Sequence, residues 1–283
     1  MSRTANMAGR GAGPLLHGAL MNGRVVVALI FREAGIRFGG GPISYLWTLV
    51  EPALLVSFVL FMRSYVRQYS AAFGDSSLLF LMTGFLTFRM VRQTANSAGR
   101  AIAANQLLFD MGVIKPPDVV IARTVVEFTI WLIIFVAFFF AIQYIINEQV
   151  ITNFQGFVLA LLSIFYFCLA MSMLNATMFA LLPVWRSIWK LMTLPLLFIS
   201  GVIYVPSSMP PEVQMIIIWN PVLHCIEGIR AASYLDYISL YDPIYLNSLS
   251  TTILLVALFI ERIYRRDIIR ADVEKFDDDE DVF

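Results

Sequence analysis

The chain has 283 residues, of which 59% are hydrophobic and 14% are charged, and its formal net charge at pH 7 is zero. Soluble domains carry roughly 45–50% apolar and about 25% charged residues, so a water-soluble fold of this size could not bury so much apolar surface. No basic patch points to nucleic acid, and lipid is the expected solvent. The composition therefore predicts an all-α integral membrane protein.

The first 22 residues contain Arg3 and Arg10 but no long apolar core, so they do not resemble a secretory signal. We expect residues 1–22 to be a mobile cytoplasmic leader. Residues 23–41 are too short and too charged to cross a membrane, and they predict an amphipathic helix in the membrane interface. Its apolar residues would lie on lipid, and its basic side chains would face the head groups: Arg24, Arg32 and Arg37.

A helix needs about 20 apolar residues to cross the roughly 30 Å hydrocarbon core. This criterion predicts six transmembrane helices within a membrane domain of residues 42–262. The predicted spans are residues 44–62, 78–98, 119–146, 154–182, 187–205 and 244–260. The apolar run of the second span ends at Phe88, before Arg89 and Arg92, so its second half must face protein or water.

The segments between and after the spans carry their own signals. Ala101–Met111 predicts a short cytoplasmic helix that is stopped by Gly112 and by two prolines. Pro206–Asp242 holds two apolar stretches too short to span, which predict a pair of short helices that re-enter the membrane from the periplasmic side. Residues 263–283 predict a cytoplasmic tail that ends in a disordered acidic run, Asp277–Asp281.

The distribution of Lys and Arg predicts the orientation. With the N-terminus in the cytoplasm, seventeen of the twenty basic residues fall on the cytoplasmic side. The exceptions are Arg63, Arg67 and Arg230. The opposite orientation would invert this ratio, so we predict that both termini are cytoplasmic.

The sequence lacks the motifs that would make it an enzyme by itself. It has no GxxxxGK[ST] phosphate loop and no Gly-rich dinucleotide fingerprint. His17, His224, Cys168 and Cys225 show no metal-ligand spacing. We therefore expect no catalytic, cofactor-binding or metal-binding residue on this chain. Uphill transport would need either an ion gradient or a separate motor.

Several motifs carry a resemblance to a known family. Arg32–Pro52 reads REAGIRFGGGPISYLWTLVEP, and Ile114–Pro117 reads IKPP just before the third predicted span. Ser200–Pro211 reads SGVIYVPSSMPP, and Trp219–Arg230 reads WNPVLHCIEGIR. Together these segments resemble the ABC-2 type permeases that export capsular polysaccharide. The resemblance extends over residues 24 to 265.

The resemblance implies a homodimer of six-span permeases in the bacterial inner membrane. It also implies a separate ATP-binding cassette ATPase dimer that binds ATP and Mg, and a periplasmic adaptor with an outer-membrane export channel. The cargo would be an anionic, lipid-linked glycan. An ABC-2 permease for O-antigen, teichoic acid, lipid or drug would have the same architecture. An ion-coupled secondary carrier would need several intramembrane acids, whereas we find only Glu51 and no internal repeat.

Polar and aromatic residues in the predicted spans are candidates for the substrate path. Glu51 precedes Pro52 in the first span, and it would serve either as a gate or in a structural ion pair with an arginine. Steps of three and four residues place a polar stripe on one side of the second span, formed by Arg89, Arg92, Asn96 and Arg100. This stripe would either line the substrate path or pair with Glu51 or lipid phosphate. Aromatic rings that would stack on sugars, or anchor the helices at the interface, are Tyr45, Trp47, Tyr166, Tyr204 and Trp219.

Two further groups follow from the predicted short helices. The cytoplasmic helix would dock in a groove of the ATPase through Gln106, Leu107, Leu108, Phe109 and Asp110, or it would be an ordinary turn. The outer helix pair would act as a periplasmic gate, with Asn220, Pro221 and Tyr234 as its candidate residues.

Overall fold

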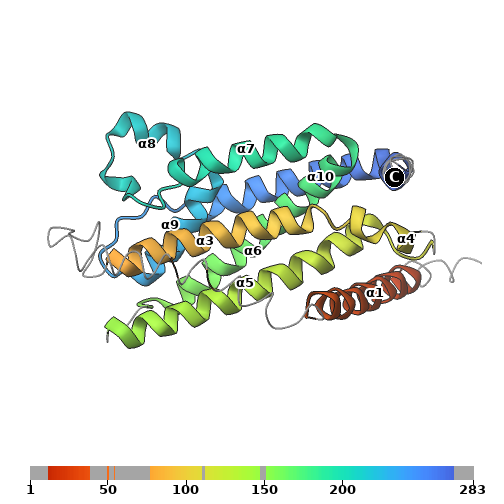
Figure 1. The fold of residues 1–283 in the computed structure, drawn as a ribbon, viewed down its shortest axis with the longest axis horizontal. Coiled ribbons are helices and arrows are strands. Elements are labelled where there is room, and N and C mark those ends of the chain that lie inside the picture. The colour runs from red at the N-terminus through yellow and green to blue at the C-terminus, as the bar shows by residue number, and fades with distance from the viewer. Residues whose placement is uncertain are drawn as a thin grey trace, which may run out of the picture.

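The computed structural model describes residues 12–38, 50, 54, 77–109, 112–146 and 151–270. Every regular element within these ranges is a helix (Figure 1). The first predicted span lies outside the described residues except for Val50 and Leu54, which are helical. The described part of the chain therefore confirms the all-helical prediction.

Four long helices form the body of the molecule: α3 (Ser77–Ala98), α5 (Pro116–Ile146), α6 (Phe154–Leu181) and α10 (Pro243–Arg270). α6 lies at the centre, where it packs against each of the other three. Its buried side chains include Phe157, Ile164 and Phe167, which join aromatic and aliphatic residues of α3 and α5 in the main apolar core. These helices correspond to the second, third, fourth and sixth predicted spans.

Three described helices are long and apolar enough to cross a membrane. They cover Pro116–Ala141, Phe154–Leu181 and Pro243–Ile269, with mean hydropathy of 2.3, 2.4 and 1.8. α3 is more polar, and in its second half Thr94 and Ser97 are buried in protein, at 0% and 1% exposed. Arg89, Arg92 and Asn96 of the same half are partly exposed, so the expectation that this half faces protein or water stays a prediction for these three residues.

The fifth predicted span is displaced toward the N-terminus. α7 covers Pro183–Ile199 instead of residues 187–205. Pro183 occupies the first turn, where its missing N–H is not needed. The helix ends before Gly201, which has a φ of 71° that only glycine adopts readily. The prediction extended the helix too far because the sequence stays apolar through Val205.

The predicted pair of short helices between the fifth and sixth predicted spans is present. A 3-10 turn, η2 (Pro206–Ser208), leads into α8 (Pro211–Ile217), and α9 (Pro221–Ser233) follows. The Asn220 side chain caps α9 by accepting a hydrogen bond from the Val222 N–H at 3.0 Å. α9 is almost completely buried against α6 and α3.

The other end of the molecule departs more from the predicted boundaries. α1 covers Ala12–Phe38, so the helix begins well before residue 23. The predicted helix at residues 101–111 is instead a 3-10 turn, η1 (Ala103–Asn105), followed by the single turn of α4 (Gln106–Phe109). α10 continues to Arg270, past the predicted end of the span, with a kink at Tyr264.

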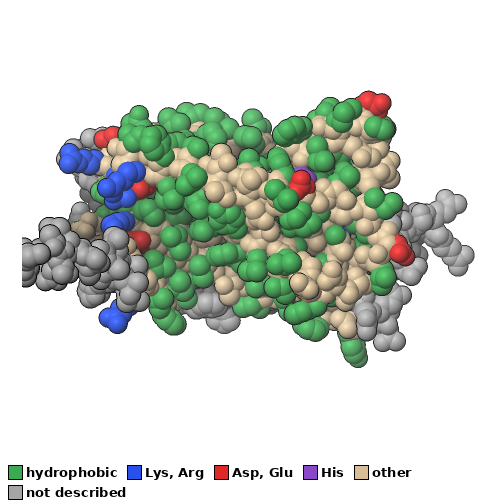
Figure 2. Space-filling model, turned by 180° about the vertical axis from the view of Figure 1, so that it is seen from behind, with side chains coloured by type: hydrophobic (Ala, Val, Ile, Leu, Met, Phe, Trp, Pro, Cys, Tyr) green, Lys and Arg blue, Asp and Glu red, His purple; other side chains and the backbone are tan. Residues whose placement is uncertain are grey.

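The two ends of the body differ in charge. α1, α4 and the C-terminal end of α10 lie together at one end, and α8 lies at the other (Figure 1). Figure 2 shows the Lys and Arg side chains of the opposite face gathered at the end that carries α1 and α4, with mostly apolar side chains covering the middle. This arrangement is the one that the positive-inside rule predicts for a cytoplasmic end.

Candidate functional site

A buried polar network joins α1 to η1 at the basic end. The Asn105 Nδ2 donates to Glu33 Oε1 at 3.0 Å and to the Ala101 carbonyl at 2.9 Å. The Arg32 guanidinium donates to the Asn105 Oδ1. Arg123 of α5 lies 3.9 Å from the second oxygen of Glu33. Both Asn105 and Glu33 are buried, so the network connects α1, η1 and α5 away from solvent.

A second network connects α1 to α3 and α5. Glu127 lies within the third predicted span and is 1% exposed, so the prediction that Glu51 is the only acid within the spans is wrong. Its Oε1 accepts a hydrogen bond from the Ser97 hydroxyl at 2.6 Å and lies 3.1 Å from Arg37 Nη2. A buried carboxylate is costly unless it is paired, and these two partners supply the pairing. Arg24, the third basic residue assigned to the interface, is exposed on α1.

The predicted stripe on α3 lies on one side of that helix. Arg89, Arg92 and Asn96 are partly exposed, and Arg100 at the end of the stripe is exposed, whereas most of the intervening positions are buried. The Arg89 guanidinium lies over the Trp131 ring, 5.7 Å from its centroid. Partial burial, and next the positive charge of Arg123, lower the pKa of Arg100. The stripe thus runs from the basic end into the membrane part of α3.

The predicted aromatic residues do not form one cluster. Tyr45, Trp47 and Glu51 lie outside the described residues. The Tyr204 hydroxyl, in the loop after α7, donates to the Ile199 carbonyl at 3.1 Å. Trp219 is 72% exposed between α8 and α9, and its ring contacts Tyr245 edge-on. These residues belong to separate elements of the outer half.

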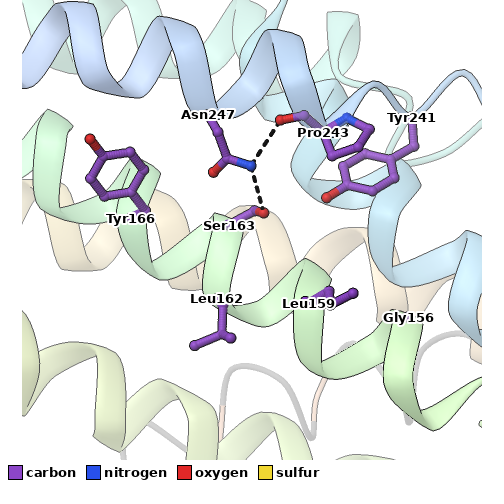
Figure 3. Close-up of a pocket in the computed structure, with 8 residues that line it drawn as sticks. All are labelled: Gly156, Leu159, Leu162, Ser163, Tyr166, Tyr241, Pro243 and Asn247. Atoms are coloured by element: carbon purple, nitrogen blue, oxygen red, sulfur yellow. Dashed lines mark hydrogen bonds between the residues drawn. The ribbon is translucent and has the colours of Figure 1, made fainter.

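Tyr166 lines a cavity of about 420 Å³ between α6 and α10 (Figure 3). Its hydroxyl lies 3.0 Å from the Thr251 Oγ1. Asn247 donates from Nδ2 to the Ser163 hydroxyl at 3.1 Å and to the Pro243 carbonyl at 2.8 Å. Most of the remaining lining is apolar, so the cavity combines an apolar floor with a few polar groups.

The predicted docking residues lie at the basic end. Leu107 is 83% exposed, Gln106 and Leu108 are partly exposed, and Phe109 is buried. Asp110 lies outside the described residues. A groove of about 360 Å³ separates α1 from this segment, and it is lined by Val25, Ala28, Leu29, Arg32, Leu108, Val113 and Ile114.

At the outer end the structure reveals an ion pair that the sequence analysis missed. Arg230 and Glu227 are both fully buried, with Nη1 3.6 Å from Oε1. Arg230 donates to the carbonyls of Gly201 at 2.6 Å, Val202 at 2.9 Å and Phe80 at 3.2 Å. In the sequence, Arg230 stood out only as an exception to the distribution of basic residues. The i, i+3 spacing of the two charges on one helix was the available signal.

Glu227 extends this network to the segment before α10. Its carboxylate accepts hydrogen bonds from the Tyr237 hydroxyl at 2.6 Å and from the Leu240 N–H at 3.1 Å. Burial, and next the Glu227 charge, raise the pKa of Tyr237. The predicted gate residues are close by in the fold. Asn220 donates to the Ser200 hydroxyl at 2.9 Å, Pro221 begins α9, and the Tyr234 ring lies 6.1 Å from that of Tyr237.

Among the described residues, no three His, Cys, Asp or Glu side chains gather where they could hold a metal ion. The polar groups of the site are instead arginines, amides and carboxylates that tie helices together or line the α3 stripe.

Residues 25–234 match the family described as the ABC-2 type transporter, so the chain belongs to this family. It is similar to the polysialic acid transport protein KpsM of Escherichia coli, with 29% identity over 235 residues that cover 83% of this chain and 90% of that protein. The capsule polysaccharide export inner-membrane protein BexB of Haemophilus influenzae is 28% identical over 238 residues, covering 79% and 84%. Its counterpart CtrC of Neisseria meningitidis serogroup A is 26% identical over 246 residues, covering 87% and 92%. With its long apolar helices, the chain is a multi-pass inner-membrane protein.

Proposed function

We propose that this chain is the permease subunit of an ATP-driven exporter that moves an anionic, lipid-linked capsular polysaccharide across the bacterial inner membrane. The observation that carries the proposal is the similarity to capsule export proteins over nearly the whole membrane part. The three relatives named above are matched over 84–92% of their own length. The chain itself is not a catalyst in this proposal. ATP and Mg bind to a separate ATPase subunit.

The proposed topology has six spans and both termini in the cytoplasm. The basic end with α1 and α4 faces the cytoplasm, and α8 and α9 face the periplasm (Figure 1). A homodimer would place two such bodies around the path. A periplasmic adaptor and an outer-membrane channel would receive the glycan beyond it.

The α3 stripe is the part of the described surface that best fits the entry of an anionic polymer. Arg100 lies at the basic end, and Asn96, Arg92 and Arg89 follow at successive turns toward the proposed membrane interior. A row of like charges attracts an oppositely charged chain without a single tight site, so the polymer can advance. We propose that the partly exposed side of α3 lines the cytoplasmic half of the path.

Leu107 is the proposed contact with the ATPase. Its side chain is 83% exposed at the basic end, where water rather than lipid would surround it. Burying a leucine side chain in a partner's groove contributes roughly 1.5–3 kcal/mol. The exposed leucine therefore favours docking of the η1–α4 segment in a groove of the ATPase.

Deletion and complementation in the source bacterium test the proposal. We expect the deletion strain to lose surface capsule and to accumulate the glycan inside the cell, and the intact gene to restore export. Purification of the tagged chain should also recover an ATPase. A deletion strain with normal capsule and a defect in another surface glycan would assign the chain to a different cargo. Transport that persisted without any ATPase would contradict the ABC mechanism.

A further inference from the structure

Among the described residues, the hydrogen bonds between α1 and η1 all involve one amide side chain, that of Asn105. Asn105 is 3% exposed, and it uses its Oδ1 on Arg32 and its Nδ2 on Glu33, two consecutive residues of α1. The third contact, from Nδ2 to the Ala101 carbonyl, fixes the amide against its own segment. A carboxylate only accepts hydrogen bonds and a guanidinium only donates them, so the Asn105 amide must present its N–H to Glu33 and its oxygen to Arg32.

The same joint reaches the membrane-spanning body. Glu33 is 7% exposed and lies between Asn105 and Arg123 of α5. α1 also packs along α5, and Leu29 joins Ala101, Ile102, Phe109 and Val120 in one buried apolar cluster. A displacement of η1 therefore acts on α1 through a buried polar contact and on α5 through the Glu33–Arg123 pair.

The opposite side of α1 faces outward. Val27 and Phe31 are 51% and 74% exposed, which suits contact with the lipid interface. The groove between α1 and α4 opens beside Leu108 and Val113, and Val113 is 62% exposed. At the basic end, exposed apolar side chains next to a groove are available to a protein partner.

We propose that α1 is part of the element that couples the ATPase to the permease, and that Asn105 is the positioning residue that joins α1 to the η1–α4 segment. This inference rests on the proposed function, because it takes the partner at Leu107 to be the ATPase. Movement delivered at α4 passes through Asn105 to α1 and through Glu33 to α5.

The experiment uses the complete permease–ATPase complex in proteoliposomes and measures glycan exported per ATP hydrolysed. Asn105→Leu removes all three contacts, and Asn105→Asp keeps an acceptor for Arg32 but opposes the Glu33 carboxylate. We expect either variant to lower the export-to-ATP ratio by about tenfold, because the polar contact that would transmit the movement of α4 to α1 is lost or opposed. ATP hydrolysis itself should stay within about twofold, because the ATPase site is on another chain.

The matched control is Thr124→Val. Thr124 is buried in α5 next to Arg123, but its hydroxyl bonds only to the Val120 carbonyl of its own helix at 2.7 Å. This control should leave the ratio unchanged. A rescue separates coupling from mere folding: Ala28→Cys and Val113→Cys line the same groove, and a flexible bis-maleimide across them should restore the ratio in the Asn105→Leu background.

Crosslinking from Leu107→Cys to the ATPase distinguishes the two levels of the proposal. If Leu107→Cys crosslinks and Asn105→Leu retains the wild-type ratio, the inference about α1 is wrong while the docking proposal stands. If the bis-maleimide does not raise the ratio of a folded Asn105→Leu complex, the role of Asn105 as a joint is also wrong. If no position along the segment crosslinks to an ATPase, the proposed function fails and the inference fails with it.

Discussion

Removing Arg230 should destabilise the protein more than removing its partner Glu227. Arg230→Met deletes a guanidinium that serves three carbonyls of two different segments, and it leaves the Glu227 carboxylate buried without its cation. Breaking a buried ion pair from one side costs about 3–5 kcal/mol. Glu227→Gln keeps an acceptor for the Tyr237 hydroxyl and leaves Arg230 with its carbonyls, so we expect a loss of only about 1–2 kcal/mol.

The double variant Arg230→Met/Glu227→Gln isolates the charge contribution. It still leaves the carbonyls of Gly201, Val202 and Phe80 without donors, but it contains no unpaired buried charge. We expect it to be more stable than Arg230→Met alone and to lose about half as much. A loss of 1 kcal/mol corresponds to roughly 2–4 °C in Tm for a large domain, so Arg230→Met should melt about 10 °C below the wild type.

The assay is thermal unfolding of the detergent-solubilised protein, followed by the fraction that remains monodisperse after heating. Thr252→Ala is the control, because Thr252 is exposed on α10 and bonds only to the Ser248 carbonyl of its own helix. If Arg230→Met melts within about 2 °C of the wild type, the ion pair does not hold the outer end together. A double variant less stable than Arg230→Met would refute the charge argument.

Three further predictions concern other parts of the fold. Gly201→Ala should lower the Tm by about 4 °C or more in the same thermal assay. The residue has a φ of 71°, and an added Cβ would lie 2.6 Å from the Pro206 Cγ. Glu127→Gln should lower the stability by about 1 kcal/mol or less, because the side chain of its partner Arg37 is 44% exposed. Glu127→Leu should lower it by about 2 kcal/mol, because this variant leaves the Ser97 hydroxyl buried without an acceptor. Equal losses of stability in the two variants would contradict this reasoning. Arg89→Ala should reduce glycan export by about tenfold with unchanged recovery of the ATPase in pull-downs, and normal export would remove Arg89 from the path.

Length and hydropathy were sufficient to locate the long helices. The predicted third and fourth spans agree with α5 and α6 to within three residues at each end. Neither α6 nor the part of α5 after Glu127 carries a charged residue, so the ends of these helices lie close to the ends of the apolar runs. At α7 and α10 the apolar run and the helix do not end together. The backbone turns at Gly201 while the sequence is still apolar, and α10 continues through the Glu261–Arg265 pair at 2.7 Å.

The candidate site was predictable in its residue types but not in its contacts. The position of the polar stripe on α3 followed from the 3.6-residue period, because neighbouring turns of one helix are local in sequence. The partner of Asn105 is 72 residues away, and the Phe80 carbonyl that accepts from Arg230 is 150 residues away. No periodicity or spacing indicates which distant groups will meet.

The sequence by itself determined the class of this protein: its apolar runs require lipid, its basic residues mark one end, and its motifs resemble those of ABC-2 permeases. These properties are sums over single residues or short windows, so they can be read before folding. Only the tertiary structure decided that Asn105 joins α1 to the η1–α4 segment and that Arg230 ties α9 to α3 and to the loop after α7. Each of those contacts depends on how helices pack, because a buried charge or amide takes the partner that packing places beside it.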